Sequence, residues 1–177
     1  MDNERSETEK EEMLHRFLSK IMNRYRDVIE EKEKKSVAEL RSLVRPFHPV
    51  IASINSELEV GGSCEKAISL GIPYFSKFRT IHPPVSFWLD FPDIIEVKGA
   101  DVMDKAIFFL SFLRSNGCEA RIYVTKKNSI FVYITSPEEF LVSPDTWSVL
   151  RSEDARQVLV QEGPLYSFND LSFEAYE

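Results

Sequence analysis

The chain has 177 residues, of which 43% are hydrophobic and 13 are phenylalanine, so it can bury one substantial core. Its 29 acidic and 22 basic residues give a net charge of −7, and residues 137–177 hold the whole excess, with 9 acidic residues against Arg151 and Arg156. This acidic region would repel a phosphate backbone, which argues against nucleic-acid binding.

The sequence shows no signal for export or for membrane insertion. The first residues, MDNERSETEKEE, are charged and lack the apolar run of a signal peptide. No segment reaches the ~20 apolar residues that cross a bilayer. We therefore expect a cytoplasmic protein without membrane association. Cys64 and Cys118 are too few for a disulfide framework and form no Cys/His cluster, so neither a disulfide nor a zinc site is expected.

The first 45 residues predict a helical extension. Leu14, Leu18, Ile21, Tyr25 and Val28 follow a spacing that is typical of an amphipathic helix with a heptad-like seam. The seam ends at EEKEKK, where lysines take the apolar positions. It is shorter than the roughly three or four heptads of an independent coiled coil. We expect it to pack on the body of the protein, with a homodimer seam or a partner's groove as the alternatives.

Further helices are predicted before the strands begin. A capping box at Ser36–Glu39 opens one helix, which Pro46 ends. Ser63 is placed to cap another. The last of these helices is apolar around nearly its whole circumference, which indicates a helix buried in the middle of a domain. The predicted helices cover residues 36–45, 49–60, 64–70 and 102–114, and the Pro- and aromatic-rich stretch 74–99 is expected to be irregular, with short helical turns around Asp93–Glu96.

Strands follow the buried helix. Alternating or β-branched runs separated by turn residues predict strands at residues 118–125, 129–134 and 139–143, and a further one at Gln157–Gln161. The tripeptide KKN between the first two suits a tight antiparallel hairpin. Helices followed by an antiparallel meander indicate an α+β domain. We place this domain at residues 46–177, after the helical extension 1–45.

The stretch GADVMDKAIFFLSFLRSNGCEARIYV, residues 99–124, resembles the core of the transglutaminase-like superfamily, which shares the papain-like fold of cysteine peptidases. Members read glycine, an acidic residue, cysteine, an acidic pair, Lys-Ala, an apolar helix, LR, a turn with glycine, and EAR. The segments CEKAISLGIPY, FWLDFP, SIFVYI and FLVSPDTW resemble further family segments in the same order. The resemblance covers residues 60–147 and implies a central helix packed on a small antiparallel sheet.

The resemblance also implies a Cys-His-Asp triad, which this chain does not carry. The DKA motif sets the register, and Val102 then stands in place of the cysteine, Ser129 in place of the histidine and Ser143 in place of the aspartate. Valine has no lone pair, and a serine hydroxyl is no base near neutral pH. The sequence therefore predicts a degenerate, non-catalytic member, acting as a structural module or binding a protein partner.

One alternative is a catalytic cysteine elsewhere. The stretch GGSCEKA mimics the family's glycine, cysteine, acidic residue and Lys-Ala, and a helix N-terminus lowers the pKa of a thiol. Cys64 is thus the alternative nucleophile of a cysteine-dependent hydrolase or acyltransferase. The first histidine after the helix that starts at Cys64 is His82. It is the candidate partner of the Cys64 thiol. Cys118 is expected to be a small core residue.

The acidic residues around the 102–114 helix are interpreted as caps. Side-chain oxygens of Asp101 and Asp104 are placed to accept from free N–H groups at the helix start, where negative charge is favoured. A metal site that adds Asp145 to them is the alternative, but no ligand spacing supports it. We expect no metal and no cofactor.

Overall fold

The computed structural model describes the backbone of residues 2–177 and the side chains of residues 11–177. The chain divides into two compact units. The first comprises the residues up to Lys34 together with His82–Trp88, and the second comprises Lys35–Ile81 and Leu89–Glu177. Within the described residues, no helix combines the length and the apolarity needed to cross a membrane.

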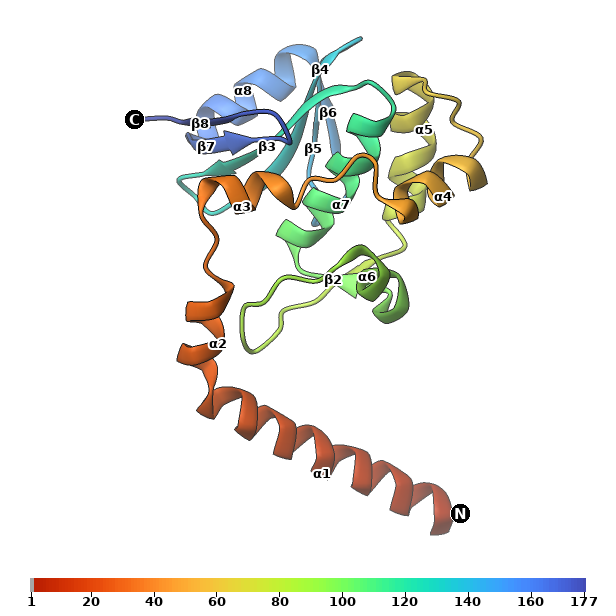
Figure 1. Ribbon diagram of the computed structural model, residues 1–177, viewed down its shortest axis with the longest axis vertical. Coiled ribbons are helices and arrows are strands. Elements are labelled where there is room, and N and C mark those ends of the chain that lie inside the picture. Colours follow the sequence, from red (N-terminus) through yellow and green to blue (C-terminus); the bar gives the residue numbers. More distant parts are fainter. Residues whose placement is uncertain (1) are drawn as a thin grey trace. The chain divides into compact units, whose positions relative to one another are not determined.

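Helices dominate the first half of the chain and strands the second (Figure 1). The helices are α1 (Asp2–Arg24), α2 (Arg26–Glu33), α3 (Val37–Ser42), α4 (Pro49–Glu57), α5 (Cys64–Phe75), α6 (Phe91–Val97), α7 (Val102–Ser115) and α8 (Ser152–Glu162). The strands are β1 (Arg79–Thr80), β2 (Gly99–Ala100), β3 (Glu119–Thr125), β4 (Ile130–Ser136), β5 (Phe140–Val142), β6 (Val149–Arg151), β7 (Pro164–Phe168) and β8 (Phe173–Ala175).

The first unit is built on α1 and α2, which follow one another almost without a break. The Tyr25 amide donates to the Ile21 carbonyl at 3.1 Å, and the Tyr25 carbonyl accepts from the Ile29 amide at 3.0 Å. The helical hydrogen-bond pattern therefore carries over from α1 to α2. The end of α2 is tied to the 82–88 segment, because the Trp88 indole N–H donates to the Glu33 carbonyl at 2.8 Å.

Helix α7 forms the centre of the second unit, as its sequence predicts. Phe108, Phe109 and Phe112 are fully buried. The Phe75 ring of α5 lies against all of them, with centroid distances of 4.9, 5.4 and 5.3 Å. Helices α4 and α5 cover α7 on one side, and strands β3 and β4 cover it on the other. An all-round apolar helix is stable only when it is covered in this way.

The large sheet has the strand order β6-β5-β4-β3-β7-β8, and every neighbouring pair is antiparallel. The predicted meander of three strands is confirmed as β3, β4 and β5, and Val124 pairs with Ile130 across the first hairpin. Helices α7 and α8 lie on opposite faces of the sheet (Figure 1). Tyr133 and Leu141 form a core cluster with Ala155 and Leu159 of α8, so side chains on the alternate positions of the strands face α7.

The predicted strand at Gln157–Gln161 is wrong, because these residues belong to helix α8. Ala155 and Leu159, which are four residues apart, are both buried, whereas Val160 is 76% exposed. That is a helical pattern and not an alternating one. The valines at 158 and 160 suggested a strand. The segment packs on an apolar face of the sheet instead, and in a helix residues three or four apart point to that face.

We expect Gly71→Ala to lower stability. A Cβ atom at this position of α5 would lie 2.6 Å from Phe112 Cε1 and 3.2 Å from Phe109 Cε2. The clash should cost about 1–3 kcal/mol, although glycine-to-alanine in a free helix gains up to about 1 kcal/mol. Urea unfolding measures the difference. Ser69→Ala, at an exposed position of the same helix, should stay within about 0.5 kcal/mol of the wild type. A stabilised Gly71→Ala would contradict the close packing of α5 on α7.

Candidate functional site

The start of α7 is the position at which the family resemblance places a reactive group. Asp101 caps the helix, as expected, because its Oδ1 accepts from the Asp104 amide at 2.8 Å. Asp104 is nearly buried and its Oδ2 accepts from the Leu89 amide at 3.1 Å. Val102 is thus the first residue of a well-capped helix, and its half-buried side chain carries no polar atom.

Ser129 and Ser143 do not face Val102 across one surface of the sheet. The Ser129 hydroxyl donates to Glu162 Oε2, at the end of α8, at 2.8 Å. It therefore lies on the α8 side, and Ile130 holds the next position, on the α7 side. Ser143 closes a turn, since its carbonyl accepts from the Trp147 amide at 2.7 Å.

A polar cluster lies near the start of α7 in place of a triad. Lys105 is 2% exposed, and its Nζ donates to Thr80 Oγ1 at 2.8 Å. Thr80 Oγ1 in turn donates to Asp145 Oδ1 at 2.9 Å. The Lys105 ammonium also lies 5.4 Å from the centre of the Trp147 ring, within the range of a cation–π contact. We call these four residues the Lys105 cluster. Asp145, a candidate metal ligand from the sequence, accepts a hydrogen bond from a threonine here.

The Lys105 cluster includes a strained aromatic residue. Trp147 has a φ of 57°, a left-handed conformation that bulky side chains rarely adopt. Its ring is held 5.3 Å from Phe109 and 6.3 Å from Phe75, measured between centroids. The buried indole N–H finds no acceptor among the described residues. The rings of α5 and α7 therefore fix this conformation, which turns Trp147 over the helices.

Sequence reasoning missed Thr80 and Lys105. One signal was present: α7 is apolar around its circumference, so a lysine in its first turns has to be buried and needs partners. Its partners Thr80 and Asp145 lie 25 residues upstream and 40 residues downstream in the chain. No local sequence pattern predicts these contacts.

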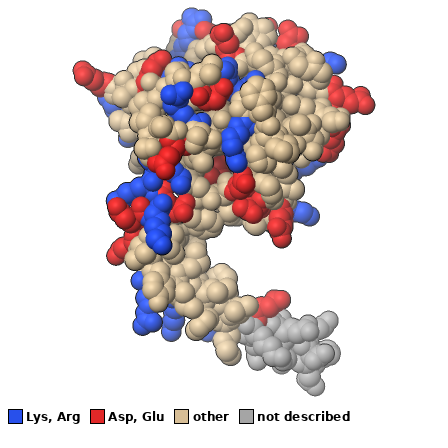
Figure 2. Space-filling model, in the orientation of Figure 1, with Lys and Arg blue, Asp and Glu red and all other residues tan. Residues whose placement is uncertain are grey.

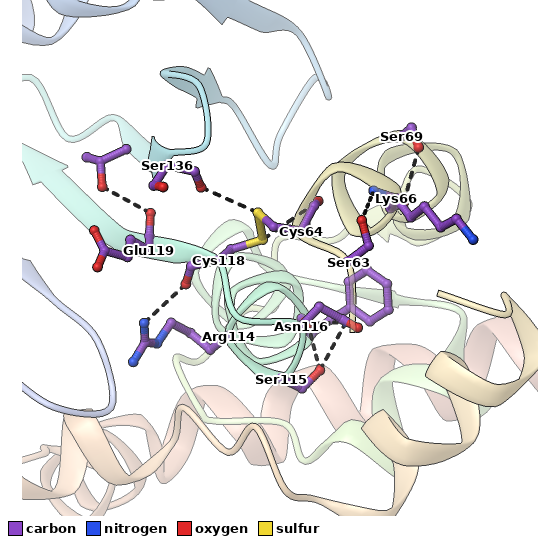
Figure 3. The surroundings of a disulfide bond; sticks show 12 residues. Ser63, Cys64, Lys66, Ser69, Arg114, Ser115, Asn116, Cys118, Glu119 and Ser136 are labelled. Atoms are coloured by element: carbon purple, nitrogen blue, oxygen red, sulfur yellow. Dashed lines mark hydrogen bonds between the residues drawn. A yellow bond between two sulfur atoms is a disulfide. The ribbon is translucent and has the colours of Figure 1, made fainter. Parts of the chain in front are cut away.

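Cys64 and Cys118 form a disulfide, with a Cα–Cα distance of 5.0 Å (Figure 3). This contradicts the expectation that the two cysteines are not paired. The fold brings them together because α5, which starts at Cys64, packs along α7, and Cys118 follows the turn that ends α7. As a nucleophile, Cys64 would need a free thiol, which the disulfide removes. His82, its suggested partner, belongs to the first unit, whereas Cys64 belongs to the second.

The acidic residues near α7 do not gather into a metal site. Among the residues that the structure describes, no three or more His, Cys, Asp or Glu side chains come together in a group that could hold an ion. The alternative of a site built from Asp101, Asp104 and Asp145 therefore gains no support from their arrangement.

The fold is a mixed α+β fold in which a buried helix packs on an antiparallel sheet. The solved structure of Legionella pneumophila LapG in its calcium-bound form matches this structure with a TM-score of 0.56, over 80% of this chain and 88% of that chain. The two sequences are 16% identical, so the likeness shows a shared fold and no more. No family model matches the chain, and no curated protein matches it either.

Lys105 should make stability depend on pH. Burial lowers the pKa of its ammonium below the usual 10.5, and the Asp145 carboxylate opposes part of this effect. The folded protein then binds fewer protons than the unfolded chain between the two pKa values, so stability rises with pH in that range. We expect the wild type to gain stability relative to Lys105→Met between about pH 8 and about pH 10.5. Urea unfolding at both pH values measures the gain, and a difference that stays constant would contradict the lowered pKa.

Proposed function

We propose that this chain is a non-catalytic domain of the transglutaminase-like fold that binds another protein. One observation supports the proposed lack of catalysis. Helix α7 begins at Val102, and the chain's two cysteines are joined to each other at the opposite end of that helix. Nucleophilic catalysis of the family type needs a thiolate with a base beside it.

Binding is assigned to an apolar stripe along α1 and α2. The stripe comprises Leu14, Phe17, Leu18, Ile21, Tyr25 and Val28, whose exposed fractions are 58, 60, 49, 39, 52 and 55%. Aligned side chains of this size seldom stay in contact with water in a monomer. Full burial of each is worth about 1.5–3 kcal/mol before the costs of association. The stripe therefore has a large gross driving force for docking.

The charges around the stripe indicate what kind of surface it fits. Residues 13–26 contain Arg16, Lys20, Arg24 and Arg26 and no acidic residue. Figure 2 shows blue Lys and Arg side chains beside uncharged surface on this segment. A second copy paired in parallel along the same stripe would bring these cations near one another, which costs energy, although Glu12, which lies 3.6 Å from Arg16, offsets part of that charge. A different protein, with an apolar groove and an acidic rim, is the better partner.

A photoreactive phenylalanine analogue at Phe17 tests the docking surface. In cells that express the full chain, irradiation should give one adduct of discrete mass, because Phe17 lies in the stripe. The same analogue at Asn23, on the opposite face of α1, should give none. Adding Leu18→Arg to the Phe17 variant should abolish the adduct, whereas Ser19→Arg, with the same change of charge, should keep it. No adduct, or adducts of equal yield from both positions, would contradict the proposal.

The alternative of a cysteine-dependent hydrolase or acyltransferase is tested after reduction of the disulfide. Reduced wild type and Cys64→Ser should release no product from peptide or thioester substrates above the buffer rate. Val102→Cys alone should also be inactive, because the base is still missing. Product release followed by chromatography measures this. Turnover that disappears in Cys64→Ser would establish the alternative and remove the non-catalytic assignment.

A further inference from the structure

The two sulfurs of the disulfide differ in their access to solvent. Cys64 is half-buried, whereas Cys118 is fully buried. A polar hollow is lined by Cys64 together with Ser63, Asn116 and Ser136, and Cys118 is absent from its wall. The Ser136 carbonyl oxygen lies 3.5 Å from Cys64 Sγ (Figure 3). A small molecule in the hollow can therefore reach one sulfur of the bond and not the other.

In the reduced pair, the helix start favours Cys64 as the attacking thiolate, whereas Glu65 in the same hollow adds a negative charge that opposes part of this effect. Cys64 is the first residue of α5, a helix of 12 residues, and Ser63 Oγ accepts from the Lys66 amide at 3.4 Å. A helix N-terminus stabilises a thiolate and so lowers the pKa of a cysteine thiol. Cys118 lies directly before a strand, so no helix N-terminus stabilises its thiolate. When the pair is reduced, Cys64 is the sulfur that carries negative charge and attacks.

We propose that Cys64 is a thiol-exchange site for small thiols and their disulfides. A small thiolate in the hollow attacks Cys64 Sγ, the Cys64–Cys118 bond breaks, and Cys118 leaves as a thiolate that takes a proton from water. The product is a mixed disulfide on Cys64. Once the Cys118 thiol has given this proton back to water, its thiolate attacks Cys64 Sγ, releases the small thiolate and restores the bond, so the exchange is reversible and protons and electrons balance at each step.

The fold tolerates an open bond, which exchange requires. Helix α5 is held on α7 by Phe75 and by the close approach at Gly71 as well as by the disulfide. Cys118 is held by its backbone, because Arg114 Nη1 donates to its carbonyl at 3.1 Å while Arg114 Nε donates to Asp170 at 2.7 Å. Opening the bond therefore frees two side chains and leaves both backbones in place.

Single-cysteine variants of the full chain test the site. Dithiobis(nitrobenzoate) should react with Cys64 in Cys118→Ser at least about tenfold faster than with Cys118 in Cys64→Ser. In guanidinium chloride the two rates should become similar. Equal rates in the folded variants, or faster reaction at Cys118, would overturn the proposal. Circular dichroism checks that both variants are folded.

A measurement on the wild type keeps the test decisive if a variant unfolds. The oxidised protein is incubated with glutathione, quenched with acid and mapped by mass spectrometry. Glutathione should be found on Cys64, with at least about tenfold less on Cys118. Absence of any mixed disulfide, or its presence mainly on Cys118, would show a purely structural disulfide. The inference stands apart from the proposed docking function, because neither outcome depends on the α1 stripe.

Discussion

Helix α7 is apolar around nearly its whole circumference, and the second unit is organised by the need to keep water from residues 104–113. Strands β3 and β4 cover one side, and α4 and α5 cover the other. Phe75 supplies the main contact from α5, where it meets Phe108, Phe109 and Phe112. Aromatic pairs of this kind add about 0.5–1.5 kcal/mol each to the burial of their area. The positions of the polar cluster and of the disulfide both follow from this packing.

A polar cluster lies at the start of α7, where the helix carries a buried lysine. Lys105 is the one cation among the buried residues that the structure describes, and it requires acceptors because an unpaired buried charge is costly. Thr80 and Asp145 provide them in a chain of two hydrogen bonds. The arrangement holds the lysine charge in place and contains no cysteine.

Much of the fold could be predicted from the sequence, because α7 and the meander have characteristic local patterns of apolar residues. The apolar circumference of residues 102–114 predicted a central helix, and alternation predicted β3 and β4. Helix α8 was missed because Val158 and Val160 favour a strand. Ala155 and Leu159 are buried together only because they pack on the sheet, which the local sequence does not show. The Lys105 cluster and the disulfide join residues that are distant in sequence, so neither follows from local spacing.

The disulfide turns residues 64–118 into a covalent ring. This ring contains α5, α6 and α7, and also the 82–88 segment that belongs to the first unit. Closing a loop between cysteines that are 54 positions apart removes unfolded-state entropy worth about 4 kcal/mol in the chain-entropy model. A protease that cuts once inside the ring would leave both fragments linked. They would migrate as one species on a gel until the bond is reduced. Comparing gels with and without reductant would therefore show whether a protease has cut inside the ring.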